Sequence, residues 1–155
     1  MNKLIFMFLT LFAINVNGMN NFGIKMGLRN DNYNSGTNIN MQGGLIWKIN
    51  FYEVNPIFIA GPNEFSFSLN NNINFFDRDN LRQYINVEIG YGFTSFYGHY
   101  EEARGYKLGL YYGINKRIIN NVELYGELGT TCFTDWINYS VKPLIISSGL
   151  ILTIH

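Results

Sequence analysis

The residues best suited to acid-base chemistry in this chain are one histidine and two nearby carboxylates. His99 is followed by Glu101 and Glu102 in the segment YGHYEEAR. A histidine can serve as a general base, but nucleophilic catalysis also needs a hydroxyl or thiol within hydrogen-bond reach. No serine stands beside His99, and the chain has one cysteine, Cys132. We therefore interpret His99 as a solvated loop residue and predict no enzymatic activity.

The sequence predicts no metal, cofactor or nucleic-acid partner. The histidines His99 and His155 are expected at opposite ends of the molecule, and Cys132 alone adds no ligand set for zinc. The glycines of GYGFTSFYG are not followed by a helix pattern, so they do not form a phosphate-binding loop. Eleven basic and eleven acidic residues give zero net charge, without the basic excess that nucleic acids select.

The N-terminal segment MNKLIFMFLTLFAINVNG has the features of a secretory signal peptide. Lys3 precedes an apolar run at residues 4–14, and Val16 and Gly18 occupy positions typical of a cleavage site. The run is too short to span a bilayer, which takes about 20 helical residues. We predict that residues 1–18 are a signal peptide and that residues 19–155 form one exported domain.

The remaining sequence alternates large apolar residues with glycine, polar or charged residues. A period of two is typical of β-strands, because successive side chains point to opposite faces. Leu108 and Leu110, for example, alternate with Lys107 and Gly109, whereas Pro56 interrupts its run. Eight such runs fit the chain, at residues 22–29, 39–49, 51–60, 64–75, 84–94, 105–114, 122–128 and 144–154.

Each predicted strand therefore has an apolar side and a polar side. The charges that we assign to the polar side, besides Glu64, are Lys25, Arg29, Lys48, Arg82, Glu88, Lys107, Glu123 and Glu127. In a soluble barrel the apolar side would face inward and could line a cup for an apolar ligand. In a membrane barrel the charges would face inward, and a lumen enclosed by eight strands is narrow enough for side chains to fill.

Three features favour the membrane arrangement. The runs are long enough to cross a bilayer as tilted strands, which takes about ten residues. The charges assigned to the interior are nearly balanced, five basic against four acidic, as burial requires. Aromatic residues gather near strand ends, where they suit the membrane interface. These aromatic residues are Phe75, Phe76, Phe96, Tyr97, Trp136 and Tyr139.

The pattern resembles the small outer-membrane β-barrel proteins of the OmpA and OmpX type. The resemblance covers essentially the whole chain after the signal peptide. Its most specific element is the C-terminal SSGLILTIH, where Ser147, Gly149, Leu152 and Ile154 are similar to the signal that the barrel-assembly machinery recognises. Such proteins commonly end on an aromatic residue, and this chain departs from that pattern with His155.

The resemblance implies an all-β fold, an eight-stranded antiparallel up-and-down transmembrane β-barrel in the cell outer membrane. The termini and the turns DRDN and NKRIINN would be periplasmic, and the segments 31–36, 61–63, 96–104 and 134–142 would face the exterior. The implied partners are outer-membrane lipid or lipopolysaccharide and, during biogenesis, the assembly machinery. The short polar loops argue against a large receptor or adhesive surface, and the filled lumen argues against a pore. We expect a structural or surface-interaction role and a monomer.

One interior contact and two alternative functions follow from the sequence. A turn centred near Ile118 would bring Lys107 diagonal to Glu127, so we predict a Lys107–Glu127 contact and expect Glu123 to face Gly113. The first alternative function is a soluble periplasmic or secreted ligand-binding β-barrel, in which Leu110 would face a cavity. The second is a lipid A-modifying outer-membrane enzyme that uses His99.

Overall fold

The chain forms eight long strands in the computed structural model, which describes residues 21–33, 36–49, 51–62, 64–95, 102–134 and 139–154. The strands are β1 (Asn21–Tyr33), β2 (Gly36–Ile49), β3 (Tyr52–Ala60), β4 (Glu64–Arg78), β5 (Leu81–Ser95), β6 (Glu102–Ile119), β7 (Val122–Thr134) and β8 (Tyr139–Ile154). Within these described ranges, no helix is long and apolar enough to cross a membrane.

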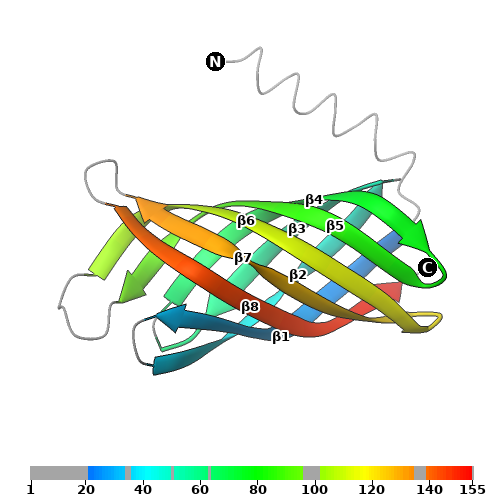
Figure 1. Ribbon diagram of the computed structural model, residues 1–155, viewed down its shortest axis with the longest axis horizontal. Helices are drawn as coiled ribbons and strands as arrows, with labels where there is room; N and C mark the ends of the chain where they lie inside the picture. The colour runs from blue at the N-terminus through cyan, green and yellow to red at the C-terminus, as the bar shows by residue number, and fades with distance from the viewer. Residues whose placement is uncertain are drawn as a thin grey trace, which may run out of the picture.

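The strands close into a single barrel. Each strand pairs antiparallel with its neighbour in the sequence, and β1 pairs with β8 to complete the circle (Figure 1). Closure leaves no unpaired strand edge, so backbone donors and acceptors are satisfied within the sheet. This arrangement confirms the predicted eight-stranded antiparallel up-and-down barrel.

The two ends of the barrel differ in how the strands are connected. At one end, called the turn end, β4 and β5 are joined by Asp79 and Asn80 alone, both with positive φ angles as a tight type I′ hairpin requires. Asn120 and Asn121 join β6 to β7 at the same end, where the barrel strands also begin and finish at Asn21 and Ile154. The other end, called the loop end, is where β1 connects to β2, β3 to β4, β5 to β6 and β7 to β8.

Several strands extend further towards the loop end than the sequence predicted. The segments 31–36, 96–104 and 134–142 were expected to be exterior loops, but residues 31–33 belong to β1, 102–104 to β6 and 139–142 to β8. In β8 the register with β7 shifts, since Gly129 pairs with Ile145 whereas Thr131 pairs with Lys142. This irregularity turns Lys142 inward, although strict alternation from Ile145 would turn it outward.

The hairpin between β6 and β7 has a different register from the predicted one. Ile118 and Ile119 continue β6, so Lys107 faces Phe133, and Glu123 faces Arg117 rather than Gly113. The predicted register was wrong by four residues, because NKRIINN was interpreted as a turn although only its last two residues connect the strands.

Most large apolar side chains of the strands point out of the barrel, and most of their charged side chains point in. The buried apolar exceptions are Ile46, Ile57, Ile59, Phe133, Ile145 and Ile151. Leu110 is 56% exposed on the outer surface, whereas the neighbouring positions Lys107 and Tyr111 are buried. The apolar cup of a soluble ligand-binding barrel would need the opposite orientation at Leu110. The outer surface also carries ring contacts, such as the stacked Phe65 and Phe93, whose centroids lie 5.4 Å apart.

Candidate functional site

The interior of the barrel concentrates the charged residues that the alternation assigned to the polar side. The structure places all eight on inward-facing positions, seven of them buried and Arg82 partly exposed. Their ion pairs form three groups along the barrel. We call these the loop-end cluster (Arg29, Glu64, Glu88, Lys107 and Lys142), the middle pair (Lys25 and Glu127) and the turn-end cluster (Lys48, Glu53, Arg82 and Glu123).

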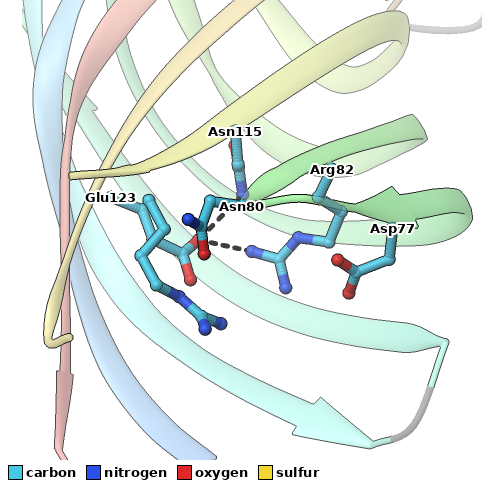
Figure 2. A pocket seen from close by; sticks show the side chains of 6 residues that line it. Asp77, Asn80, Arg82, Asn115 and Glu123 are labelled. Atoms are coloured by element: carbon cyan, nitrogen blue, oxygen red, sulfur yellow. Dashed lines mark hydrogen bonds and ion pairs between the residues drawn. The ribbon is translucent and has the colours of Figure 1, made fainter. Parts of the chain in front are cut away.

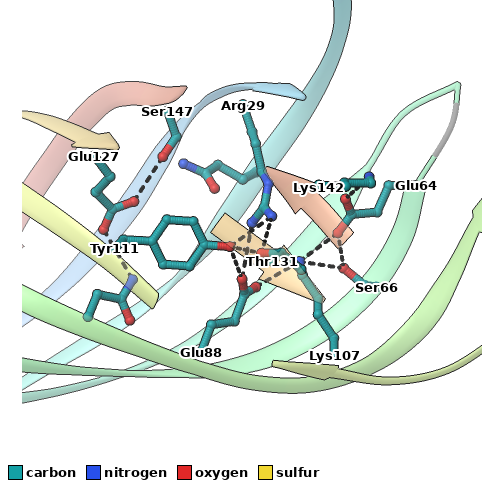
Figure 3. Close-up of polar contacts among 12 residues, drawn as sticks. Arg29, Glu64, Ser66, Glu88, Lys107, Tyr111, Glu127, Thr131, Lys142 and Ser147 are labelled. Atoms are coloured by element: carbon teal, nitrogen blue, oxygen red, sulfur yellow. Dashed lines mark hydrogen bonds and ion pairs between the residues drawn. The ribbon is translucent and has the colours of Figure 1, made fainter. Parts of the chain in front are cut away.

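The loop-end cluster is organised around Lys107 (Figure 3). Its Nζ lies 2.6 Å from Glu64 Oε1 and 2.7 Å from Glu88 Oε1, and none of the three side chains is exposed to solvent. Lys142 Nζ lies 3.0 Å from the second oxygen of Glu64. Both lysines also lie over the Phe133 ring, whose centroid is 5.6 Å from Lys107 Nζ and 5.3 Å from Lys142 Nζ. Two carboxylates therefore hold two lysines in a site without solvent.

Arg29 extends this cluster towards the middle of the barrel. Its Nη1 lies 3.2 Å from Glu88 Oε2, and its Nη2 donates to the Tyr111 hydroxyl at 2.9 Å and to Thr131 Oγ1 at 3.1 Å. The Tyr111 hydroxyl donates in turn to Glu88 Oε2 at 2.5 Å and contacts Thr131. Glu88 thus accepts from a lysine, an arginine and a tyrosine, which offsets the cost of burying its charge.

The middle pair joins β1 to β7. Lys25 Nζ lies 2.7 Å from Glu127 Oε1 and 4.1 Å from the centre of the Tyr125 ring. Glu127 also accepts from the Tyr84 hydroxyl at 2.9 Å and from Ser147 Oγ at 3.0 Å. The predicted Lys107–Glu127 contact is wrong, because the four-residue register difference in the β6–β7 hairpin places these residues apart and each finds other partners.

The turn-end cluster is partly open to solvent. Arg82 bridges two carboxylates, with Nη1 2.7 Å from Glu53 Oε1 and Nη2 2.5 Å from Glu123 Oε2, and Lys48 Nζ lies 2.9 Å from Glu123 Oε1. The side chains of Lys48 and Arg82 remain 10% and 12% exposed. A pocket of about 50 Å³ opens beside them (Figure 2), lined by Asp77, Asn80, Arg82, Asn115, Arg117 and Glu123.

Buried tyrosines lie against glycines of the neighbouring strands. Tyr84 pairs with Gly113, and a Cβ atom added to Gly113 would lie 2.2 Å from Cζ of the Tyr84 ring. Tyr111 faces Gly129 in the same way, and a Cβ atom there would lie 2.4 Å from its Cδ1. These glycines give the rings the space they need to lie flat against the inner wall.

Comparison with known proteins identifies the architecture. No protein-family model matches the chain, and no curated protein matches it. The structure is similar to the crystal structure of Neisserial surface protein A (NspA), with a TM-score of 0.58 and 12% identity over 86% of this chain and 96% of that one. It is also similar to a structure from the de novo design of transmembrane β-barrels, with a TM-score of 0.54 and 13% identity over 86% of this chain and 95% of that one.

The chain has the fold of a small transmembrane β-barrel. In membrane proteins of this fold, lipid surrounds an apolar outer surface and polar side chains face the interior, and the side chains of this chain are distributed in the same way. In the described part of this transmembrane β-barrel, no three His, Cys, Asp or Glu side chains are grouped to hold a metal ion. Cys132 is a free thiol of intermediate exposure.

Two interior charges of the transmembrane β-barrel, Glu53 and Lys142, were missed in the sequence. Glu53 is buried between the less buried Tyr52 and Val54, as alternation requires. Later in β3, however, the buried positions hold isoleucines, so the sequence does not show a consistently polar face. The cross-strand pair Lys48–Glu53 is a signal that could have identified it. Lys142 gave no such signal, because the irregularity in β8 changes its orientation.

The structure describes some of the remaining predicted residues, whereas others lie outside the described ranges. In β8, Ser147 is buried and bonded to Glu127, Gly149 lies on the same inner face, and Leu152 and Ile154 point outward. The signal peptide (residues 1–18) and His99 lie outside the described residues, as do Glu101, His155 and three of the aromatic residues expected at strand ends, Phe96, Tyr97 and Trp136. Phe75, Phe76 and Tyr139 are exposed on the outer surface, as an aromatic belt requires.

Proposed function

We propose that this protein is exported by its N-terminal signal peptide to the cell outer membrane, where it serves as a non-catalytic barrel with a structural or surface-interaction role. The observation that carries the proposal is the inverted arrangement of side chains. Leucines such as Leu110 cover the outside, while Lys107, Glu64 and Glu88 are fully buried inside. Such an inside-out distribution suits a lipid environment and would be unstable in water.

The packed interior supports a role without transport or catalysis. Tyr84, Lys25, Lys107 and Phe133 are among the largest fully buried side chains. Side chains of this size fill an eight-stranded lumen and leave no wide pore. The carboxylates inside are held in ion pairs, so they are not positioned as free acids or bases for a substrate.

The proposal is tested by cell fractionation and by gel migration. Closed membrane barrels often keep their fold in cold detergent, so the outer-membrane fraction should contain a band that changes apparent mass on boiling. Mass spectrometry of the same band should give a mature chain that begins at Met19, after cleavage of residues 1–18. Recovery in the soluble periplasm, without a boiling-dependent shift, would contradict the proposal and favour the ligand-binding alternative.

The outward-facing residues nearest the turn end support a proposed contact with membrane lipid. Arg78 pairs with Leu81, which pairs with Lys116, so two cations flank a leucine on the outer surface. Ile118 and Ile119 beside them are also exposed. Cations bordering an apolar band suit phosphate headgroups. Native mass spectrometry should show less bound anionic phospholipid for Arg78→Gln/Lys116→Gln than for the wild type, and equal retention would contradict this contact.

Recognition by the assembly machinery is the proposed role of the C-terminal strand. Leu152 and Ile154 are exposed on the outer surface at the end of β8, where a membrane-bound factor could bind them during biogenesis. Replacing Ile154 with asparagine should lower the amount assembled in cells more than it lowers refolding into vesicles. Equal losses in both assays would indicate a defect of the barrel itself. We propose that the assembled protein is a monomer.

The lipid A-modifying alternative depends on His99, which lies outside the described residues. A His99→Ala variant expressed in the host should leave the acylation of lipid A unchanged. A changed acylation pattern, with normal amounts of barrel in the membrane, would overturn the non-catalytic assignment.

A further inference from the structure

Between the turn-end and loop-end clusters, the inner faces of β3, β4 and β5 carry a group of small polar side chains. Asn55 of β3 pairs with Asn70 of β4, and Asn72 of β4 pairs with Asn86 of β5. Ser68 and Asn74 lie on the same face of β4. We call this surface the asparagine wall; its members are Asn55, Ser68, Asn70, Asn72, Asn74 and Asn86.

Oxygen atoms of the asparagine wall are buried without a protein partner. Each of its six residues has one side-chain oxygen with no hydrogen bond to any residue in the described part of the chain. Asn55 Nδ2 and Arg82 Nε are the unsatisfied donors nearby. A buried polar atom that forms no hydrogen bond costs roughly 1–3 kcal/mol, so a stable barrel would not leave six on one surface unsatisfied.

The chemistry of the wall decides what can occupy it. Its unsatisfied atoms are mainly acceptors, so an occupant must donate hydrogen bonds or carry positive charge. A cation is disfavoured, because the inner face of the described strands already holds six cationic side chains against five carboxylates. An anion would meet carbonyl oxygens. Water donates two hydrogen bonds and is neutral, and buried water commonly satisfies such groups.

The asparagine wall contacts the turn-end cluster at one end and the loop-end cluster at the other. Asn72 donates to Glu53 Oε2 at 3.1 Å, and Glu53 is paired with Arg82, which lines the open pocket (Figure 2). In the other direction Asn70 pairs with Glu88. Glu88 and its partner Lys107 (Figure 3) have no solvent exposure. Water could therefore enter through the pocket but would stop at the loop-end cluster.

We propose that the asparagine wall binds a file of ordered water molecules that enters from the turn-end pocket and ends at the loop-end cluster. The water supplies the donors that the asparagine and serine oxygens lack. The barrel is thus hydrated from one end only, and this property does not depend on which membrane holds it.

Two substitutions of Asn55 distinguish a wall that binds water from one that does not, because the order of their stabilities differs between the two cases. Asn55→Leu has nearly the same size as the wild type but cannot bond to water, whereas Asn55→Ser leaves room for an extra water. With bound water, the leucine variant should have a folded-to-unfolded ratio roughly tenfold below the wild type, and the serine variant should be more stable than the leucine variant. On a dry wall, leucine would remove two unsatisfied atoms and would be the more stable variant.

Direct detection of water provides the second measurement. In detergent micelles, the side-chain amide protons of Asn55 should give cross-peaks at the water frequency in NMR spectra of the wild type. Tyr84, whose hydroxyl bonds to Glu127, provides an internal reference for a buried group with a protein partner. Absence of water cross-peaks, or a leucine variant at least as stable as the serine variant, would overturn the proposal. If neither variant refolds, the wild-type spectrum decides.

Discussion

The loop-end and turn-end clusters use the same residue types in different surroundings. Glu88 at the loop end and Glu123 at the turn end each accept from one lysine and one arginine. Glu88 and its partner Lys107 have no solvent exposure, whereas Glu123 and its partners line or border an open pocket. The two carboxylates therefore differ mainly in their access to water.

This difference determines what an ion pair contributes to stability. In a site closed to bulk solvent, an ion that loses its partner cannot recover its full hydration, and the loss costs about 3–5 kcal/mol. Near solvent, water replaces the missing partner, and the loss is typically about 1 kcal/mol or less. We therefore expect substitutions in the loop-end cluster to lower the free energy of unfolding more than substitutions in the turn-end cluster.

The largest effect is expected for Glu88→Gln. The substitution keeps the size of the side chain but leaves three buried cations, Arg29, Lys107 and Lys142, with Glu64 as their carboxylate. The free energy of unfolding in lipid vesicles, measured by urea titration, should fall by about 4 kcal/mol. A Glu88→Gln/Lys107→Met double variant should recover part of this loss. A loss no larger than that of Glu123→Gln would remove the distinction between the two ends.

The middle pair should behave like the loop end, since it is equally enclosed. Glu127→Ala removes the carboxylate of Lys25 and the acceptor of Tyr84 and Ser147. We expect a loss of about 3 kcal/mol in the same titration, because the Tyr125 ring still stabilises the lysine. The added change Lys25→Met should restore stability in part, whereas unchanged stability of Glu127→Ala would contradict its enclosed position.

The sequence was sufficient to predict which side chains face inward but not which of them meet. Alternation with a period of two separates the residues of one strand between its two faces. It assigned Lys25, Glu88 and Lys107 to the polar face, and the structure buries all three inside the barrel. Contacts across the lumen depend instead on how far each strand is shifted against the next. Lys25 of β1 reaches Glu127 of β7, past β8, and no local pattern contains that information.

Irregular positions limited the prediction of strand ends and register. In β8 the register shift between Lys142 and Ile145 reverses the alternation, so a parity rule assigns Lys142 to the wrong face. In β6, Ile118 is an extra residue beside the turn, and the polar neighbours Asn120 and Asn121 alone make the connection. Both features arise from the geometry of barrel closure and are not specified by hydrophobicity.

A third prediction tests the space beside the buried tyrosines. Gly113→Ala would place a methyl group 2.2 Å from the Tyr84 ring, which is fully buried and cannot move without losing its bond to Glu127. We expect the free energy of unfolding to fall by about 2 kcal/mol. Gly126→Ala is the matched control, because a Cβ atom there points outward and meets no atom within 4 Å.

The two glycine-to-alanine substitutions should differ in the direction of their effect on the free energy of unfolding. Alanine at position 126 should be neutral or slightly stabilising, by up to about 1 kcal/mol, since glycine loses more backbone freedom on folding. If both variants lose the same stability, the cause is a general intolerance of β6 and β7 to substitution, and the ring contact at Gly113 is not the reason.

The smallest loss in free energy of unfolding is expected for Glu123→Gln at the turn end. The dependence of this loss on salt further tests the difference between the turn-end and loop-end clusters. Arg82 keeps Glu53, and Lys48, whose side chain is 10% exposed, can turn its ammonium group towards solvent, so the loss should be about 1 kcal/mol. Raising the ionic strength screens charges that face water but affects buried ones little. The difference between Glu123→Gln and the wild type should therefore shrink as salt is added, while the loss in Glu88→Gln stays constant. If the Glu88→Gln loss also shrinks, then salt ions reach the loop-end cluster, and the two clusters do not differ in their access to bulk solvent.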